Sequence, residues 1–148
     1  MKPMSATVAV ALLIPAAGQA QGLVAQDFCW GLKRTIEAAE YQGGFLLLER
    51  SRAAPPHLGF RHGCRATGDE KRQYWLCSQN LAPAGMSGDA LAGRVTACLP
   101  EAVRTGGAYG RESVFTLPHA QIRINESGGP GAKVGRIVQL VVEATPAQ

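Results

Sequence analysis

The chain has 148 residues, a net charge of +4 at pH 7 and a hydrophobic fraction of 46%. This length suits one domain with a single buried core. The positive charge is too small for the basic footprint of a nucleic-acid-binding domain, so we expect no specific nucleic-acid partner.

The N-terminus has the pattern of a secretory signal peptide. Lys2 precedes an apolar run over residues 6–14, and Pro15 ends any helix there. Small side chains at Gly18 and Ala20 predict cleavage after Ala20, which makes residues 1–20 the signal peptide and residues 21–148 one disulfide-braced domain. The apolar run is about half of the roughly 20 residues that a membrane span needs. We therefore expect no membrane span in the mature chain, and a periplasmic or secreted protein.

The first half of the domain predicts one helix followed by three strands. A stripe at helical spacing predicts a helix over residues 27–41, which Asp27 caps. The stripe consists of Phe28, Leu32, Ile36 and Ala39. Short apolar or alternating runs predict strands at 45–49, 57–64 and 73–78, with a proline-containing loop over 50–56 and a turn at 67–71.

The second half predicts one helix and then strands. Ser87 is a suitable N-cap for a helix that runs to Leu99, before Pro100. Its apolar stripe contains Leu91, Val95 and Cys98. Strands are predicted at 113–117, 121–125 and 134–143, with a glycine-rich turn at 127–131.

These elements predict an α+β fold. The expected order is α-β-β-β-α-β-β, with a possible further strand, and turns rather than helices join most strands. We expect two helices packed on one face of a mainly antiparallel sheet of about five to six strands.

Four cysteines remain after the predicted cleavage site, namely Cys29, Cys64, Cys77 and Cys98. An even number in a small exported chain favours two disulfides, and the spacing matches no zinc motif. Of the three possible pairings we favour Cys77–Cys98 with Cys29–Cys64, since Cys98 lies on the buried stripe of its helix and is expected to face a strand. The pairing Cys64–Cys77 is least expected, because it closes a hairpin that a short turn already closes.

The most distinctive polar feature is a basic segment between residues 50 and 75. Its basic residues outnumber the acidic Asp69 and Glu70, and two aromatic residues end it. The candidate binding residues are Arg50, Arg52, Arg61, Arg65, Arg72, Tyr74 and Trp75, and Lys71 is a further basic residue of the segment. Arginine and aromatic side chains are enriched in interface hot spots, so this segment predicts docking to an acidic partner. A solvated loop and hairpin is the alternative interpretation.

Catalytic signals are weak. The best candidate is a general acid–base pair of His119 with Glu112, as a small secreted ribonuclease-like hydrolase would use. His57 and His62, five residues apart on a predicted strand, are expected to point to opposite faces. No serine-nucleophile, phosphate-loop or metal motif occurs, so we expect no cofactor and no metal.

The sequence thus favours a non-catalytic, exported binding domain, inhibitor-like or immunity-like, whose partner is an unidentified protein or an anionic envelope component. A small secreted hydrolase and a structural envelope accessory protein are the two alternatives. The oligomeric state stays open.

Overall fold

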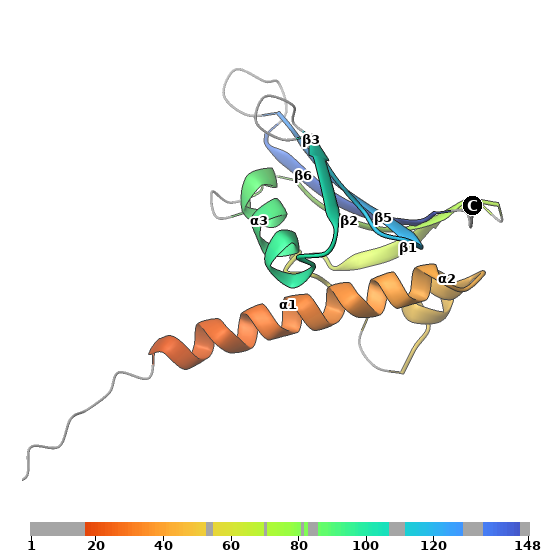
Figure 1. The fold of residues 1–148 in the computed structure, drawn as a ribbon, viewed down its shortest axis with the longest axis horizontal. Helices are drawn as coiled ribbons and strands as arrows, with labels where there is room; N and C mark the ends of the chain where they lie inside the picture. Colours follow the sequence, from red (N-terminus) through yellow and green to blue (C-terminus); the bar gives the residue numbers. More distant parts are fainter. Residues whose placement is uncertain are drawn as a thin grey trace, which may run out of the picture.

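The computed structural model describes residues 17–52, 55–69, 71–80, 82, 86–106, 112–128 and 135–145, with side chains from Asp27 onward. This part of the chain contains three helices, namely α1 (Ala17–Ala39), α2 (Gly44–Glu49) and α3 (Gly88–Cys98). It contains six strands, namely β1 (Cys64–Gly68), β2 (Gln73–Asn80), β3 (Val103–Gly106), β4 (Glu112–Thr116), β5 (Ala120–Ser127) and β6 (Ile137–Ala144). Figure 1 shows α1 crossing below the sheet, with α3 on the left of the sheet and α2 on the right.

The six strands form one antiparallel sheet in the order β1-β2-β6-β5-β4-β3. Its register places Trp75, Val142, Ile122 and Phe115 in one row across four strands. All four are buried, as the alternation of inward and outward residues along a strand requires. The predicted α+β class with an antiparallel sheet and two disulfides is confirmed.

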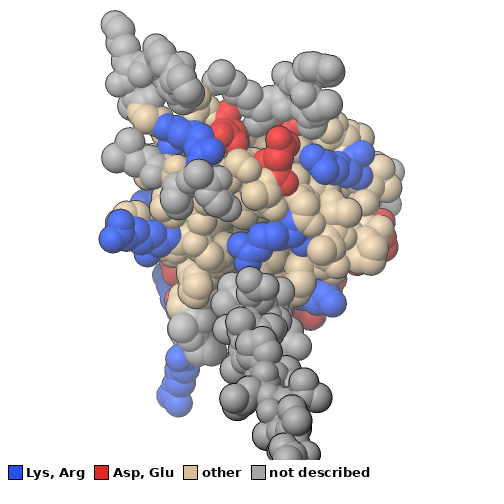
Figure 2. All heavy atoms as spheres, turned by 90° about the vertical axis from the view of Figure 1, so that its left-hand side faces the viewer, with Lys and Arg blue, Asp and Glu red and all other residues tan. Residues whose placement is uncertain are grey.

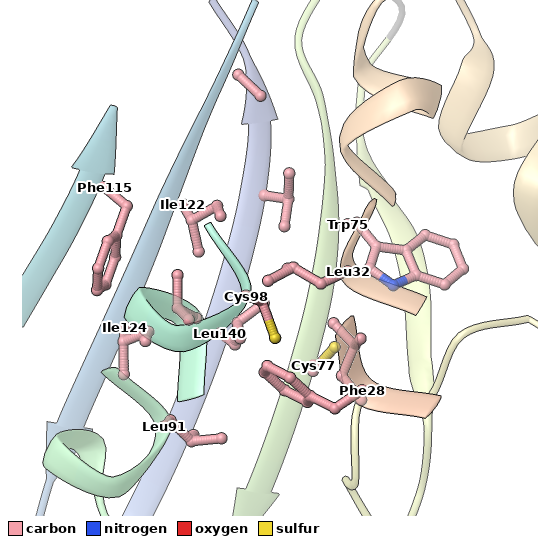
Figure 3. Packing of buried hydrophobic residues seen from close by; sticks show 14 of the residues in the cluster. Phe28, Leu32, Trp75, Cys77, Leu91, Cys98, Phe115, Ile122, Ile124 and Leu140 are labelled. Atoms are coloured by element: carbon pink, nitrogen blue, oxygen red, sulfur yellow. The ribbon is translucent and has the colours of Figure 1, made fainter. Parts of the chain in front are cut away.

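The helices cover one face of the sheet and leave the other face open. Phe28 and Leu32 of α1 and Leu91 of α3 belong to the same buried cluster as the inward residues of the strands. Figure 3 shows these side chains and those of the central strands pointing into the shared core. The open face carries the alternate strand residues, such as Leu76 and Val141, which are only half-buried.

Both predicted helices are present. Residues 27–39 lie in α1, which begins at Ala17, so the predicted cleavage site after Ala20 falls within its first turn. Residues 1–16 lie outside the described part, and the signal peptide stays a prediction. Ser87 caps α3, where its Oγ accepts the backbone N–H of Ala90 at 3.0 Å. Among the described helices, none is both long and apolar enough to cross a membrane.

The strand predicted at 45–49 is wrong, because these residues form α2. Phe45 and Leu48 are buried three residues apart, while Leu47 is 68% exposed, which is a helical pattern. A short apolar run does not distinguish strand from helix, and leucine favours the helix.

The strand predicted at 57–64 is also wrong. Leu58 and Gly59 have φ angles of 50° and 78°, which no strand accommodates. The segment consists of turns closed by the N–H of Phe60 on the carbonyl of His57 and the N–H of Gly63 on that of Phe60. Strand β1 starts only at Cys64 and extends into the turn predicted at 67–71.

The C-terminal strands are close to their predicted positions, whereas β3 was not predicted. β4, β5 and β6 overlap the predictions at 113–117, 121–125 and 134–143. β3 has four residues, all exposed, and therefore no buried alternation that the sequence could reveal. The turn predicted at 127–131 lies mostly outside the described residues.

The favoured disulfide pairing is wrong. The bonds are Cys29–Cys98 and Cys64–Cys77 rather than Cys77–Cys98 and Cys29–Cys64. Cys64 and Cys77 are direct cross-strand partners with a Cα–Cα distance of 4.2 Å, typical of a pair without mutual backbone hydrogen bonds. Cys98 faces the core, as expected, but α1 lies beside α3 there, and Cys29 is its partner.

The two disulfides should differ in their contribution to stability. Cys29–Cys98 spans 69 residues and Cys64–Cys77 spans 13. Chain-entropy loss in the unfolded state then predicts that replacing the first pair by serine lowers the free energy of unfolding by about 4 kcal/mol, and the second by about 3 kcal/mol. Urea unfolding of the two double variants measures both, and a larger loss for Cys64–Cys77 would contradict this ranking.

Substitution by alanine should have opposite effects on stability at two glycines. A Cβ on Gly44 would collide with the backbone carbonyl oxygen of Ala38, where α2 folds back on α1. Gly93 is exposed on α3 and has open space around it. Gly44→Ala should cost about 2 kcal/mol or more, whereas Gly93→Ala should add up to about 1 kcal/mol of helix stability. Thermal unfolding checks both, and a stable Gly44→Ala would mean that α2 does not pack on α1 in this way.

Candidate functional site

The basic residues singled out in the sequence gather around the β1–β2 hairpin, at one edge of the sheet. We call this the hairpin surface and define it as the exposed side chains of Arg50, Arg52, Arg61, Arg65, Lys71 and Arg72 with the half-buried Tyr74. Arg50 and Arg52 follow α2, which packs beside β1. Arg61 precedes β1, Arg65 lies on it, and Lys71 and Arg72 lie in the turn to β2.

Trp75 is not part of this surface. Its side chain is completely buried, in the row that runs through Val142 and Ile122. Its ring centroid lies 6.4 Å from that of Phe45 on α2. Trp75 is therefore a core residue in this structure, because strand alternation turns it inward, while Tyr74 faces the open side opposite Glu143.

Two carboxylates near the hairpin surface accept hydrogen bonds from backbone N–H groups. Glu49 Oε1 accepts the N–H of Ala66 on β1 at 3.2 Å. Asp69 Oδ1 accepts the N–H groups of Lys71 and Arg72 at 2.9 and 2.8 Å and so fixes the hairpin turn. These contacts position the turn and the strand edge without pairing with the arginine side chains.

One ion-pair cluster lies at the end of the hairpin on the open face. Glu143 pairs with Arg72 at 2.9 Å and with Arg123 at 3.0 Å, and only 12% of its side chain is exposed. The hydrogen bond to Glu143 raises the pKa of Arg72 above its usual value. Arg123 was not predicted as a site residue. Its position between the buried Ile122 and Ile124 is the sequence signal that places it on the open face.

Two hollows flank the hairpin on the open face. One has a volume of about 330 Å³, and Arg65 and His62 line it together with Cys64 and Leu76. The other has a volume of about 480 Å³ and lies between Lys71, Arg72 and the end of β6. The first hollow combines Arg65 with apolar and neutral polar groups, whereas Glu143 adds a carboxylate to the lining of the second.

The predicted histidine–glutamate pair is not formed. Glu112 begins β4, and His119 lies in the turn after its other end. At about 3.3 Å per residue, the strand between them separates the two side chains by well over 10 Å. His57 and His62 lie in turns rather than on a strand, and both are exposed. In the described residues no group of three histidine, cysteine or acidic side chains is arranged to hold a metal ion.

The opposite end of the molecule has a different character. Figure 2 views the side on which α3 and the N-terminal part of α1 lie. The visible Lys and Arg side chains there stand apart from one another on a mostly neutral surface.

No protein-family model matches this chain, and no curated protein or solved structure is significantly similar to it.

Removal of the Glu143 charge should expose more positive charge on the open face. Glu143→Gln releases both Arg72 and Arg123, whereas Glu112→Gln makes the same change in net charge at the far end of β4. We expect Glu143→Gln to elute from a heparin column at higher salt than Glu112→Gln, because the released Arg72 belongs to the hairpin surface and Arg123 lies on the same face of the sheet. Equal elution of the two variants would show that Glu143 does not mask these arginines.

Proposed function

We propose that this protein is a non-catalytic, exported binding domain that docks an acidic partner through the hairpin surface. The observation that carries the proposal is that six exposed basic side chains lie along the β1–β2 hairpin and the segment after α2, which packs beside β1. Within the described residues only Arg72 of the six takes part in an ion pair. The positive electrostatic potential of these side chains attracts an acidic partner and favours its correct orientation on encounter.

The rigidity of the hairpin supports the same proposal. Cys64–Cys77 and the antiparallel register fix Arg65 on β1, and the backbone of Arg61 donates to Gln79 Oε1 on β2 at 3.1 Å. Binding to a surface that is already ordered loses less conformational entropy. Inhibitor-like and immunity-like proteins need this property, because they occupy a partner without changing it.

The edge of β1 favours a partner that binds to side chains over a partner that adds a strand to the sheet. The outward N–H of Ala66, at the middle of β1, is already bonded to Glu49. An incoming strand would have to displace this carboxylate before it could extend the sheet. The arginines and the two hollows are accessible without any such rearrangement.

A hydrolase gains no support from the positions of His119 and Glu112, which the fold keeps apart. A structural accessory protein of the envelope stays the alternative, and it differs from the proposed function in needing no charge-dependent partner.

A pair of charge-matched variants tests the proposal. Arg61→Glu with Arg65→Glu reverses two charges on the hairpin surface, and Lys33→Glu with Arg104→Glu reverses two on α1 and β3. Immobilised wild-type protein should capture an acidic component from an envelope extract of its source organism. The hairpin variant should lose about 10- to 100-fold in affinity for that component, at on the order of 1 kcal/mol per reversed charge.

The control variant should retain the affinity, and circular dichroism should show that both variants are folded. Equal binding by the two variants would contradict the proposal. Turnover of a ribonucleic acid, glycan or peptide substrate that is lost in His119→Ala would contradict its non-catalytic part.

A further inference from the structure

A second candidate site lies between α1, α3 and the loop of residues 55–59. This hollow, which we call the α1–α3 pocket, has a volume of about 310 Å³. Phe28 and Trp30 of α1, the loop itself and Arg94 of α3 line it, and so does Asp27. The volume is at the lower end of the range for small-molecule sites.

Arg94 is a cation placed against apolar groups. Its guanidinium carbon lies 4.0 Å from the centre of the Phe28 ring, within the range of a cation–π contact. Partial burial lowers the pKa of Arg94. Within the described residues it forms no ion pair, although Asp27 lines the same pocket. A guanidinium held in this way favours an anion that enters the pocket.

Trp30 supplies an exposed apolar wall. Its side chain is 58% exposed, which is unusual for tryptophan in a small domain. Arg34, one turn further along α1, lies 4.7 Å from the Trp30 ring centre and so holds the indole in place. Tryptophan and arginine next to each other are typical of residues that contribute most to binding.

The pocket is ordered by covalent and backbone constraints. Cys29, between Phe28 and Trp30, is bonded to Cys98, which lies one turn after Arg94 on α3. The loop approaches α1 at Gly31, where a Cβ would lie 3.2 Å from side-chain atoms of both Pro56 and Leu58. Leu58 keeps a φ of 50°, a conformation that non-glycine residues adopt at a cost. A strained residue in a cavity wall is a feature of ligand sites.

We propose that the α1–α3 pocket binds a small apolar carboxylate, with the ring or aliphatic group between Trp30 and the loop and the carboxylate on Arg94. The volume of about 310 Å³ is sufficient for an aromatic group with its carboxylate or for a short peptide end. Either a free aromatic acid or the C-terminal residue of a peptide supplies this chemistry. This binding is independent of the acidic partner proposed for the hairpin surface.

The two tryptophans of the chain allow a direct test by nuclear magnetic resonance. The indole N–H signal of Trp30 reports on the pocket, and that of the fully buried Trp75 is an internal control. The probes are phenylacetate and phenylacetamide, which differ in charge, and N-acetyl-Ala-Phe with a free or an amidated C-terminus. We expect an acid to shift the Trp30 signal saturably without shifting that of Trp75, and the matching amide to bind at least about tenfold more weakly.

Variants separate the charge from the fold. Arg94→Met keeps an apolar stem over Phe28 and should weaken binding of the acid about tenfold or more. Arg104→Met removes an arginine that lies 5.6 Å from the Phe115 ring centre at the other sheet edge, and should leave binding unchanged. Asp27→Asn removes a like charge and should leave binding equal or tighter.

Tighter binding of phenylacetate identifies a free acid as the source of the ligand, and tighter binding of the peptide identifies a chain end. Equal binding of acid and amide to the wild-type protein would overturn the proposal, even if Arg94→Met failed to fold. Unchanged binding by folded Arg94→Met would overturn it as well. Arg61→Glu with Arg65→Glu should not affect this binding, so failure here is distinguishable from failure of the hairpin proposal.

Discussion

The disulfide between Cys29 and Cys98 is the constraint on which the arrangement of the helices depends. It joins α1 to α3 across 69 residues of chain and lies at the boundary of the core that both helices share with the sheet. A domain of this size gains a limited amount of stability from its apolar core, so a long-range covalent link is a large part of the total. This link holds α1 against α3. The chain then folds back at Gly44, and α2 covers the β1 end of the sheet.

This arrangement separates two surfaces of different chemistry. At the β1–β2 edge, backbone bonds to Glu49 and Asp69 leave most of the arginine side chains to solvent. In the α1–α3 pocket, the partly buried Arg94 lies over Phe28, and the exposed Trp30 and a constrained loop form the other walls. A disulfide stabilises each surface, Cys64–Cys77 the first and Cys29–Cys98 the second. Both are therefore ordered before any partner arrives, which reduces the entropy that binding costs.

The parts of the fold that the sequence predicted are those with strong periodicity or a specific cap. Ser87 and the stripe through Leu91 and Val95 determine α3, and the alternation in β5 and β6 determines the central strands. The errors have physical causes. The run Phe45–Glu49 is too short to reveal its period, β3 has no buried residue, and the turn conformation at Leu58 depends on contacts with α1. The prediction of the disulfide pairing was wrong because the sequence does not show that α1 and α3 lie side by side. For the same reason the α1–α3 pocket, built from three segments far apart in the chain, was not predicted.

The most direct test of this account is the mapping of the disulfides in the unreduced protein. Trypsin should place the four cysteines on four different peptides, because Lys33, Arg61, Arg65, Arg72 and Arg94 separate them. Digestion at mildly acidic pH, which limits thiol exchange, followed by mass spectrometry identifies the linked pairs. Residues 62–65 should be linked to residues 73–94, and the peptide ending at Lys33 should be linked to residues 95–104. Linkage of residues 73–94 to residues 95–104 would contradict this pairing, because α3 would then be bonded to the sheet and α1 would not be held against α3.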